Sequence, residues 1–179
     1  FIVVNHLREQ IIERVGDSWN GIPIRYVIQE PLSGTAGALW LLRDHLHDRF
    51  LVVNSDDLYE KNDLERLVQH DRSMFVHKVD RSLSAAAQTD EYDRFLGLGP
   101  GSLAVCGAYV LGPELFEIDP IEIQVSIYRE YGLPQTLEVI AKTLPIQTVQ
   151  ATSWQPVGTH EQLKIAITLN CREPGTRKH

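Results

Sequence analysis

The feature that most constrains the fold of this chain is a regular alternation of short β-branched runs with amphipathic helical stretches. Residues 36–47 are typical of the helical type, because Leu39, Leu42 and Leu46 fall on one face. Strand-like runs lie at 1–4, 22–29, 50–54 and 74–79, and the helical stretches between them end at residues 15, 47 and 70. Repeated β-α-β units imply parallel strands joined by right-handed crossovers. The sequence therefore predicts an α/β fold with a doubly wound, mostly parallel sheet.

The second half of the chain returns to strand and helix signals after one interruption. Over residues 80–101 no period is sustained and Ser, Ala, Asp and Gly dominate, so we expect a loop or lid there. A Thr-x-x-Gln capping box, formed by Thr159 and Gln162, indicates the start of a last helix. Further strands are expected at 103–111 and 146–149, and helices from 113 and at 134–144. Since no linker divides the chain, we expect a single domain over residues 1–179.

The composition excludes several classes of protein. With 43% hydrophobic residues among 179, the chain can bury a sizeable core and is neither disordered nor fibrous. The net charge of −7 and the scattered Lys and Arg residues argue against a nucleic-acid partner. No stretch approaches the ~20 apolar residues of a membrane span, and no signal peptide is visible. Cys106 and Cys171 lie far apart without a ligand-spaced partner, which indicates reduced thiols in the cytoplasm, with Cys106 in the core.

Two adjacent carboxylates, Asp56 and Asp57, follow the buried strand expected at 50–54. Ligands of mostly parallel sheets bind just outside the carboxyl ends of the strands. Carboxylate oxygens in that place suit a Mg²⁺ ion that carries substrate phosphates, because Mg²⁺ takes one or two protein carboxylates and fills its octahedron with water and phosphate oxygens. Asp56 is therefore the predicted metal ligand and Asp57 a second candidate. The alternative is that Asp56 caps the next helix or starts a turn.

A second loop, from Gln29 to Ala38, has a composition suited to binding a ligand. Its glycines would let a ligand approach the main chain closely, and Gln29 offers both a donor and an acceptor, as a nucleobase edge requires. The alternative is a plain strand-to-helix turn with Thr35 as its N-cap. The loop is not a phosphate-binding loop, because no Gly-Lys-Ser/Thr follows and no Gly-x-Gly-x-x-Gly is present.

Together these segments resemble the nucleotidyltransferase family that makes nucleotide sugars from sugar 1-phosphates and nucleoside triphosphates. The resemblance is carried by blocks that follow the family's order: Val3-Val4-Asn5 with Gln10-Ile11, Gln29 with Gly34–Ala38, Val53–Asp56, Gly107–Leu111 with Pro113–Phe116, and Trp154–Thr159. It implies a Rossmann-like fold similar to glycosyltransferase A, with a mixed but mostly parallel sheet. It also implies a transferase that uses Mg²⁺.

The resemblance assigns roles to individual residues. Gln29 and Gly34 would contact the base, and Thr35 and Ala36 belong to the same nucleotide-binding loop. Asp56 would hold the catalytic Mg²⁺. We expect Gln29, Gly34 and Asp56 to line one cleft.

The resemblance also places Gly107 beside the sugar. The sugar phosphate would attack the α-phosphorus of a nucleoside triphosphate and release pyrophosphate, so no protein nucleophile is needed. The histidines at positions 6, 70 and 160 are accordingly not catalytic candidates.

The chain departs from the family pattern at several points. The family's glycine-rich signature loop, with its Arg and Lys, lies before the strand at which this chain begins, so we expect an N-terminally truncated and inactive fragment. The Glu-x-Lys-Pro segment that grips the sugar phosphate is not found between residues 80 and 101. Pro156 stands where the family has its second metal Asp, and Ser55 replaces a usual Gly.

Two other functions stay open. A catalytically silent module that binds a nucleotide sugar, in a regulatory or scaffold role, would account for Pro156 and for the missing sugar-phosphate segment together. A glycosyltransferase that uses Ser55-Asp56-Asp57 as an Asp-x-Asp-like metal motif is less favoured, because Ser55 replaces the first carboxylate. The base, the sugar and the oligomeric state, including a homo-oligomer, are left open by the sequence.

Overall fold

The computed structural model describes residues 1–170, which form two compact units. The first unit contains Phe1–Arg49 and Gly112–Leu144, and the second begins with Phe50–Leu111 and resumes at Pro145. The chain crosses between the units three times, so neither unit is continuous in sequence.

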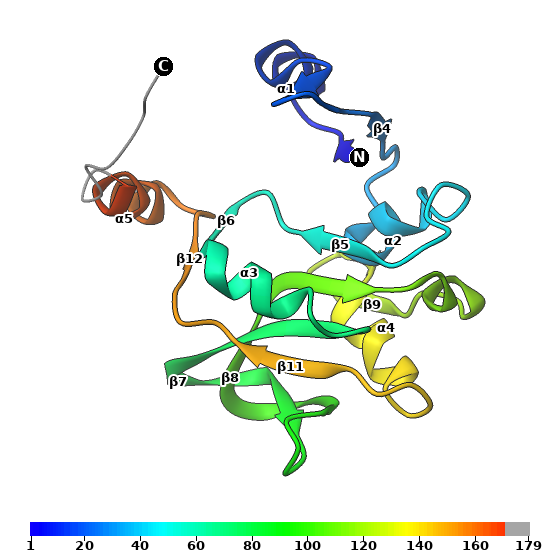
Figure 1. The fold of residues 1–179 in the computed structure, drawn as a ribbon, viewed down its shortest axis with the longest axis vertical. Helices are drawn as coiled ribbons and strands as arrows, with labels where there is room; N and C mark the ends of the chain where they lie inside the picture. The colour runs from blue at the N-terminus through cyan, green and yellow to red at the C-terminus, as the bar shows by residue number, and fades with distance from the viewer. Residues whose placement is uncertain (171–179) are drawn as a thin grey trace. The chain divides into compact units, whose positions relative to one another are not determined.

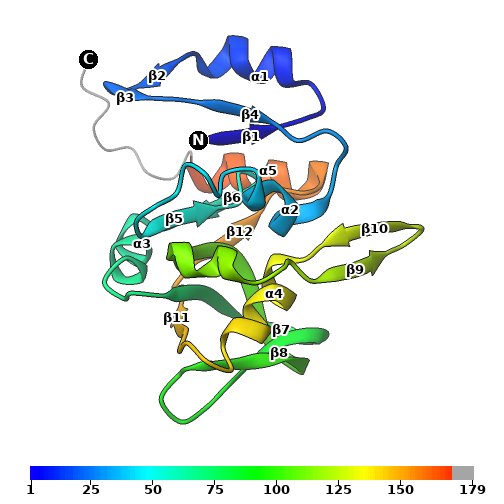
Figure 2. The ribbon, with the colours of Figure 1, turned by 90° about the vertical axis from the view of Figure 1, so that its right-hand side faces the viewer.

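The first unit consists of short helices and three two-stranded sheets (Figure 1). Its elements are β1 (Ile2–Val4), α1 (Arg8–Val15), β2 (Ser18–Trp19), β3 (Ile22–Pro23), β4 (Tyr26–Ile28), α2 (Gly34–Trp40), the 3₁₀ helix η1 (Pro113–Glu117), β9 (Glu122–Val125), β10 (Tyr128–Tyr131) and α4 (Leu133–Ile140). β1 and β4 pair in parallel, with Val3 opposite Val27, as predicted for strands joined through a helix. β9 and β10 form an antiparallel hairpin next to the start of α4 (Figure 2).

The strand predicted over residues 22–29 is divided in two. β3 pairs antiparallel with β2, and β4 pairs with β1. The break lies at Ile24 and Arg25, where the chain changes partner: the Ile24 amide still donates to Asp17 O at 2.8 Å, and Arg25 O accepts from the Ile2 amide at 2.8 Å. The helix predicted over 36–47 is also shorter, since α2 ends at Trp40 and hydrogen-bonded turns continue to Leu46.

The second unit is built on a four-stranded sheet in the order β11-β7-β8-β5. Its elements are β5 (Phe50–Val53), β6 (Asp57–Tyr59), α3 (Lys61–Leu67), β7 (Ser73–Thr89), β8 (Phe95–Leu111), β11 (Gln147–Gln150), β12 (Trp154–Pro156) and α5 (His160–Asn170). β11 is parallel to β7, whereas β8 is antiparallel to both of its neighbours. The α/β class with a mixed sheet is confirmed, and in this sheet the parallel pairing is limited to β7 and β11.

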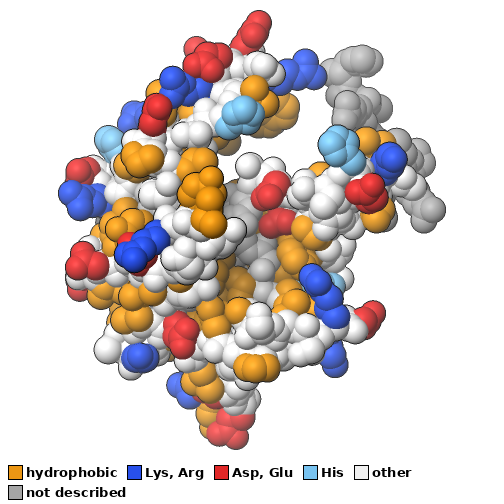
Figure 3. Space-filling model, turned by 180° about the vertical axis from the view of Figure 1, so that it is seen from behind, with side chains coloured by type: hydrophobic (Ala, Val, Ile, Leu, Met, Phe, Trp, Pro, Cys, Tyr) orange, Lys and Arg blue, Asp and Glu red, His pale blue; other side chains and the backbone are white. Residues whose placement is uncertain are grey.

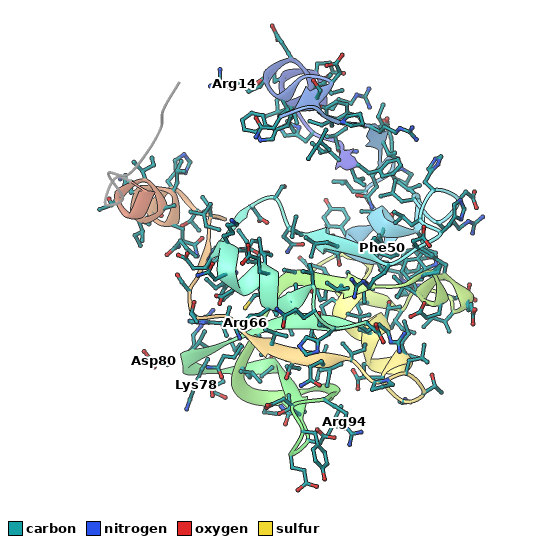
Figure 4. All side chains as sticks on the ribbon, in the orientation of Figure 1. Arg14, Phe50, Arg66, Lys78, Asp80 and Arg94 are labelled. Carbon is teal, nitrogen blue, oxygen red and sulfur yellow. The ribbon has the colours of Figure 1, made fainter. Side chains whose placement is uncertain are left out.

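The loop or lid predicted over residues 80–101 is replaced by a hairpin of β7 and β8, each 17 residues long. Gly99 pairs with Ala86 and Gly101 with Leu83, and the register shifts at several points. The Ser, Ala and Gly residues of this stretch give no hydrophobic period, and the strands pair through main-chain hydrogen bonds, which need none. The turn is closed by Asp90, which accepts hydrogen bonds from the amides of Tyr92 and Arg94. The Arg94 side chain, labelled in Figure 4, also donates to Asp90.

The core of the second unit lies under β7 and β8. It contains Leu67, Phe75, Cys106, Ala108, Val110, Val149 and Ala151, with Tyr59, Leu64 and Trp154 packed against it. Cys106 is fully buried, as the sequence predicts, and Cys171 lies outside the described residues. Thr159 caps α5 as predicted, since the Gln162 amide donates to Thr159 Oγ1 at 3.2 Å, while Gln162 Oε1 accepts from the amide of Gly158, one residue before the cap, at 2.9 Å.

Lys and Arg side chains are dispersed over the face shown in Figure 3 and do not gather into a basic stripe. None of the helices formed by residues 1–170 is long and apolar enough to span a bilayer.

Candidate functional site

The loop that joins β4 to α2 in the first unit is braced by Gln29. Gln29 is 7% exposed, and its main-chain amide donates to Val4 O at 2.9 Å. Its side-chain Nε2 donates to Ser33 Oγ and to Gly34 O, both at 2.9 Å. The predicted base-contacting side chain therefore also holds the loop in shape.

Gly34 and Gly37 satisfy steric demands of the protein itself. Gly34 has a φ of +81°, and a Cβ there would lie 2.6 Å from Tyr131 O. A Cβ on Gly37 would lie 2.2 Å from Ser33 Oγ. The sequence attributes these glycines to close approach of a ligand, whereas the structure shows close approach of a neighbouring main chain and side chain.

The loop joins strand β4 to helix α2, as the alternative expects, but Thr35 does not cap α2, so the predicted N-cap is wrong. The helix begins at Gly34, with Ser33 as the residue before it. Thr35 Oγ1 instead accepts a hydrogen bond of 3.1 Å from the amide of Leu133, the first residue of α4. Ala36 is 0% exposed, so its side chain belongs to the core and it could meet a ligand only through its main chain.

The acidic loop of the second unit leads from β5 into β6. The Asn54 amide donates to Gly107 O at 2.8 Å, which extends the pairing of β5 with β8 by one residue. Asp56 is exposed, and its main-chain carbonyl accepts from the Val157 amide at 2.7 Å. Asp57 is half-buried and its Oδ2 is 3.1 Å from Tyr59 Oη. The loop thus exposes the Asp56 carboxylate, while Tyr59 holds the Asp57 carboxylate by a hydrogen bond.

The environment of Asp57 raises its pKa above the usual range. Partial burial is the main cause, the hydrogen bond from Tyr59 opposes it, and the negative charge of Asp56 adds to it. Burial, together with the charge of Asp57, also raises the pKa of Tyr59, so the phenol remains a hydrogen-bond donor. The phenol is also 2.7 Å from Cys106 O, and its single proton serves either acceptor.

The pairing of β6 with β12 is not predicted by the sequence, because three-residue strands leave no measurable period. The register sets Trp154 opposite Tyr59 and Pro156 opposite Asp57. Nε1 of Trp154 is buried and finds no hydrogen-bond partner among the described residues. The position at which the resemblance places a second metal carboxylate therefore lies beside Asp57 but carries no side-chain ligand atom.

The donor set fits a metal ion held by one protein carboxylate. Within residues 1–170 no group of three or more His, Cys, Asp or Glu side chains is placed to hold a metal. An exposed Asp56 suits Mg²⁺, which keeps water and phosphate oxygens in most of its coordination positions. Asp57 is less suited, because it is partly buried, engaged by Tyr59 and harder to ionise.

A cavity of about 370 Å³ opens beside this loop in the second unit. The carboxylates form its polar side, and α5 with its preceding strand end forms its apolar side. The lining residues are Ser55, Asp56, Asp57, Leu58, Val157, Leu163, Ala166 and Ile167.

Gly107, the predicted sugar-contacting residue, is buried in β8 under Asn54. It has a φ of +70°, and a Cβ there would lie 2.2 Å from Asn54 Nδ2. Gly107 thus leaves room against β8 for the side chain of Asn54, the residue that follows β5. Gln29 and Gly34 lie in the first unit while Asp56 and Gly107 lie in the second, and a common cleft for them stays a prediction.

Comparison with known proteins gives a consistent picture. The sequence profile of the family described as Nucleotidyl transferase matches residues 1–95. A UTP–glucose-1-phosphate uridylyltransferase, AglF of Haloferax volcanii, is 24% identical over 169 residues, which cover 86% of this chain and 69% of that protein. The bifunctional protein GlmU of Methanocaldococcus jannaschii is 23% identical, with coverage of 88% of this chain and 40% of that protein.

Solved structures show the same fold. A putative glucose-1-phosphate thymidylyltransferase from Bacillus anthracis superposes with a TM-score of 0.76 at 18% identity, over 98% of this chain and 78% of that one. An apo UDP-glucose pyrophosphorylase gives 0.74 at 16% identity, over 95% and 80%. The inositol-1-phosphate CTP transferase from T. maritima gives 0.73 at 14% identity, over 98% and 77%. These neighbours share the Rossmann-like architecture with a mixed sheet.

Proposed function

The chain belongs to the nucleotidyl transferase family, and from that premise we propose that it transfers a nucleotidyl group from a nucleoside triphosphate to a sugar 1-phosphate. The observation that carries the proposal is the family match over residues 1–95, since this span includes both the 29–38 loop and Asp56. The sugar 1-phosphate is suggested by relatives whose names include glucose-1-phosphate and inositol-1-phosphate.

The 29–38 loop is assigned to the nucleoside. Gln29 would meet the base edge through its carboxamide oxygen, because its Nε2 is already bonded to Ser33 and Gly34. The main chain of Gly34, Thr35 and Ala36 would line the same contact, since the Ala36 side chain is buried.

Asp56 is assigned to the phosphates. A Mg²⁺ ion held there would supply charge neutralisation for the phosphate oxygens. The Asp56 carboxylate is exposed, and the hydrogen bond from the Val157 amide to Asp56 O fixes the main chain of this residue. Its role is to place negative charge where a phosphate-bound cation is needed.

The reaction needs no nucleophile from the protein. A phosphate oxygen of the sugar 1-phosphate forms a bond to the α-phosphorus, and the bond from that phosphorus to the bridging oxygen breaks, so pyrophosphate leaves with the electron pair. Gly107, which supports Asn54 at the end of β5, is assigned to the sugar side of the site. The distant cysteines favour a cytoplasmic setting for this chemistry.

The test is a pyrophosphate-release assay on the complete natural protein that carries this sequence. Each of the four common nucleoside triphosphates is combined with a panel of hexose 1-phosphates and inositol 1-phosphate. We expect release with at least one pair and a strong loss in Asp56→Asn. Full activity in Asp56→Asn, or no release with any pair, would overturn the proposal.

A second candidate, a catalytically silent module that binds a nucleotide sugar, is favoured by one observation. Pro156, which has no side-chain ligand, lies in register with Asp57 where a second metal carboxylate would be placed. Such a module would bind nucleotide sugars in calorimetric titration and release no pyrophosphate. Binding together with Mg²⁺-dependent release would exclude it.

A further inference from the structure

The 29–38 loop is held from outside by the segment Tyr131–Leu133, which joins β10 to α4. The Tyr131 amide donates to Ser33 O at 2.8 Å, and the Leu133 amide donates to Thr35 Oγ1 at 3.1 Å. These two bonds lie on either side of Gly34, whose absent Cβ lets the Tyr131 main chain approach. The loop is thus fixed by residues about a hundred positions away in sequence.

The 131–133 segment is itself anchored by Thr136. Thr136 is 0% exposed, and its Oγ1 donates to Gly132 O at 2.7 Å and accepts from the Ile121 amide at 2.9 Å. The Gly132 amide closes the base of the hairpin by donating to Ile121 O at 3.0 Å. This hydroxyl therefore both donates and accepts a hydrogen bond inside the protein.

We propose that Thr35 and Thr136 are positioning residues for nucleotide binding, and that the 131–133 segment holds the loop in its binding shape. Thr35 acts through Leu133, and Thr136 acts through Gly132. The inference rests on the proposed function, since it assigns a role in holding the loop that would bind the nucleotide. A loop held in its bound shape loses less conformational freedom when the ligand arrives, and affinity rises accordingly.

The decisive measurement is nucleotide affinity in folded variants. Calorimetric titration with each nucleoside triphosphate and Mg²⁺ is performed on the wild type, Thr35→Val, Thr35→Ser and Thr136→Val, at a temperature at which circular dichroism shows every variant folded. We expect Thr35→Val to weaken nucleotide binding about fivefold to tenfold, which corresponds to the loss of one hydrogen bond. Thr35→Ser keeps the hydroxyl and should bind as tightly as the wild type. Thr136→Val should weaken binding in the same direction.

The matched control is Thr143→Val. The Thr143 hydroxyl donates to Ile140 O within the same turn at the end of α4, so the same substitution there should leave affinity unchanged. Hydrogen exchange gives a second readout, because the amides of Tyr131 and Leu133 should gain protection when nucleotide binds. A purely structural role would lower the melting temperature without changing the affinity of the folded protein.

The outcomes separate this inference from the proposed function. If Thr35→Val binds as tightly as the wild type, the inference is wrong while the function stands. If Thr35→Val binds weakly but Thr136→Val and the exchange of the 131 and 133 amides are unaffected, Thr35 touches the nucleotide directly and the positioning role is wrong. If the wild type binds no nucleoside triphosphate, the function and the inference both fail.

Discussion

Asp56 is exposed and Asp57 is half-buried beside Tyr59, although the two are neighbours in the chain. We predict that Asp56→Asn in the complete natural protein lowers turnover by about 10²-fold or more, because it removes charge from the cation that stabilises the transition state. Asp57→Asn is the matched control and should cost much less. Initial rates of pyrophosphate release measure both, and a larger loss in Asp57→Asn would show that the ligand is misassigned.

The raised pKa of Asp57 predicts a dependence of stability on pH. A carboxyl whose pKa is higher in the folded state binds its proton more tightly there, so its contribution is full below the unfolded pKa and is lost as the pH rises through the folded value. The ionised Asp57 therefore destabilises the fold at neutral pH. We predict that Asp57→Asn raises the free energy of unfolding at pH 7.

Urea denaturation of wild type and Asp57→Asn between pH 7 and pH 3.5 tests this dependence. The difference in the free energy of unfolding between Asp57→Asn and the wild type should shrink toward zero as the pH falls below the ordinary pKa of Asp, about 3.9. A gain that grows on acidification would contradict the assigned direction.

Among the elements, α3 is tied to the bend before β12 by Asp63, which is 1% exposed. Asp63 Oδ1 accepts from Arg66 at 2.7 Å, and Oδ2 accepts from the amide and the hydroxyl of Thr152 at 2.7 and 2.9 Å. Burial works to raise the pKa of Asp63, but these hydrogen bonds outweigh it and hold the pKa below its usual range. Arg66 also donates to Gln150 O in β11 and is shown in Figure 4.

We predict that Asp63→Ala destabilises the fold by about 3 kcal/mol, because the hydrogen bonds that Arg66 and Thr152 donate to a buried carboxylate are lost. Glu65→Ala on the same helix removes an exposed ion pair with Lys61 and should cost less than about 0.5 kcal/mol. Chemical denaturation at pH 7 compares the two. Equal effects would mean that the Asp63 network does not fasten α3 to the bend.

The junction of β5 with β8 depends on Gly107. We predict that Gly107→Ala costs about 2–4 kcal/mol, since the new Cβ meets Asn54 and the φ of +70° disfavours a side chain. Gly21→Ala is the control, because Gly21 has a φ of +79° with nothing within 4 Å and so isolates the backbone cost, about 1 kcal/mol. Denaturation midpoints should fall further for Gly107→Ala, and the reverse order would contradict the packing argument.

For the whole molecule, ligand binding should appear as stabilisation. A nucleoside triphosphate with Mg²⁺ at about 100 times its Kd should add about 2.7 kcal/mol. For a protein of this size that corresponds to a rise in Tm of roughly 5–10 °C. Differential scanning fluorimetry measures the shift, and EDTA should reduce it. In Asp56→Asn the shift should no longer depend on Mg²⁺, and no shift with any triphosphate would contradict nucleotide binding.

The sequence by itself determined the elements whose signals are local. The helical signal at the end of α2, the strand β5 with Asp56 shortly after it, the N-cap of α5 and the blocks of the family pattern all lie within short stretches. Periodicity, caps and turn residues act over a few positions, so they can be read without knowing what each segment contacts. The nucleotidyl transferase family followed from these stretches alone.

Tertiary structure decided the features that depend on distant partners. The β7–β8 hairpin replaces a predicted loop because small residues pair through their main chains. The β6–β12 pair brings Pro156 opposite Asp57, and the Thr35 hydroxyl meets the Leu133 amide 98 residues later. Hydrogen bonds that involve the main chain leave no pattern in the sequence of side chains. Whether they form depends on which segments the folded core brings together.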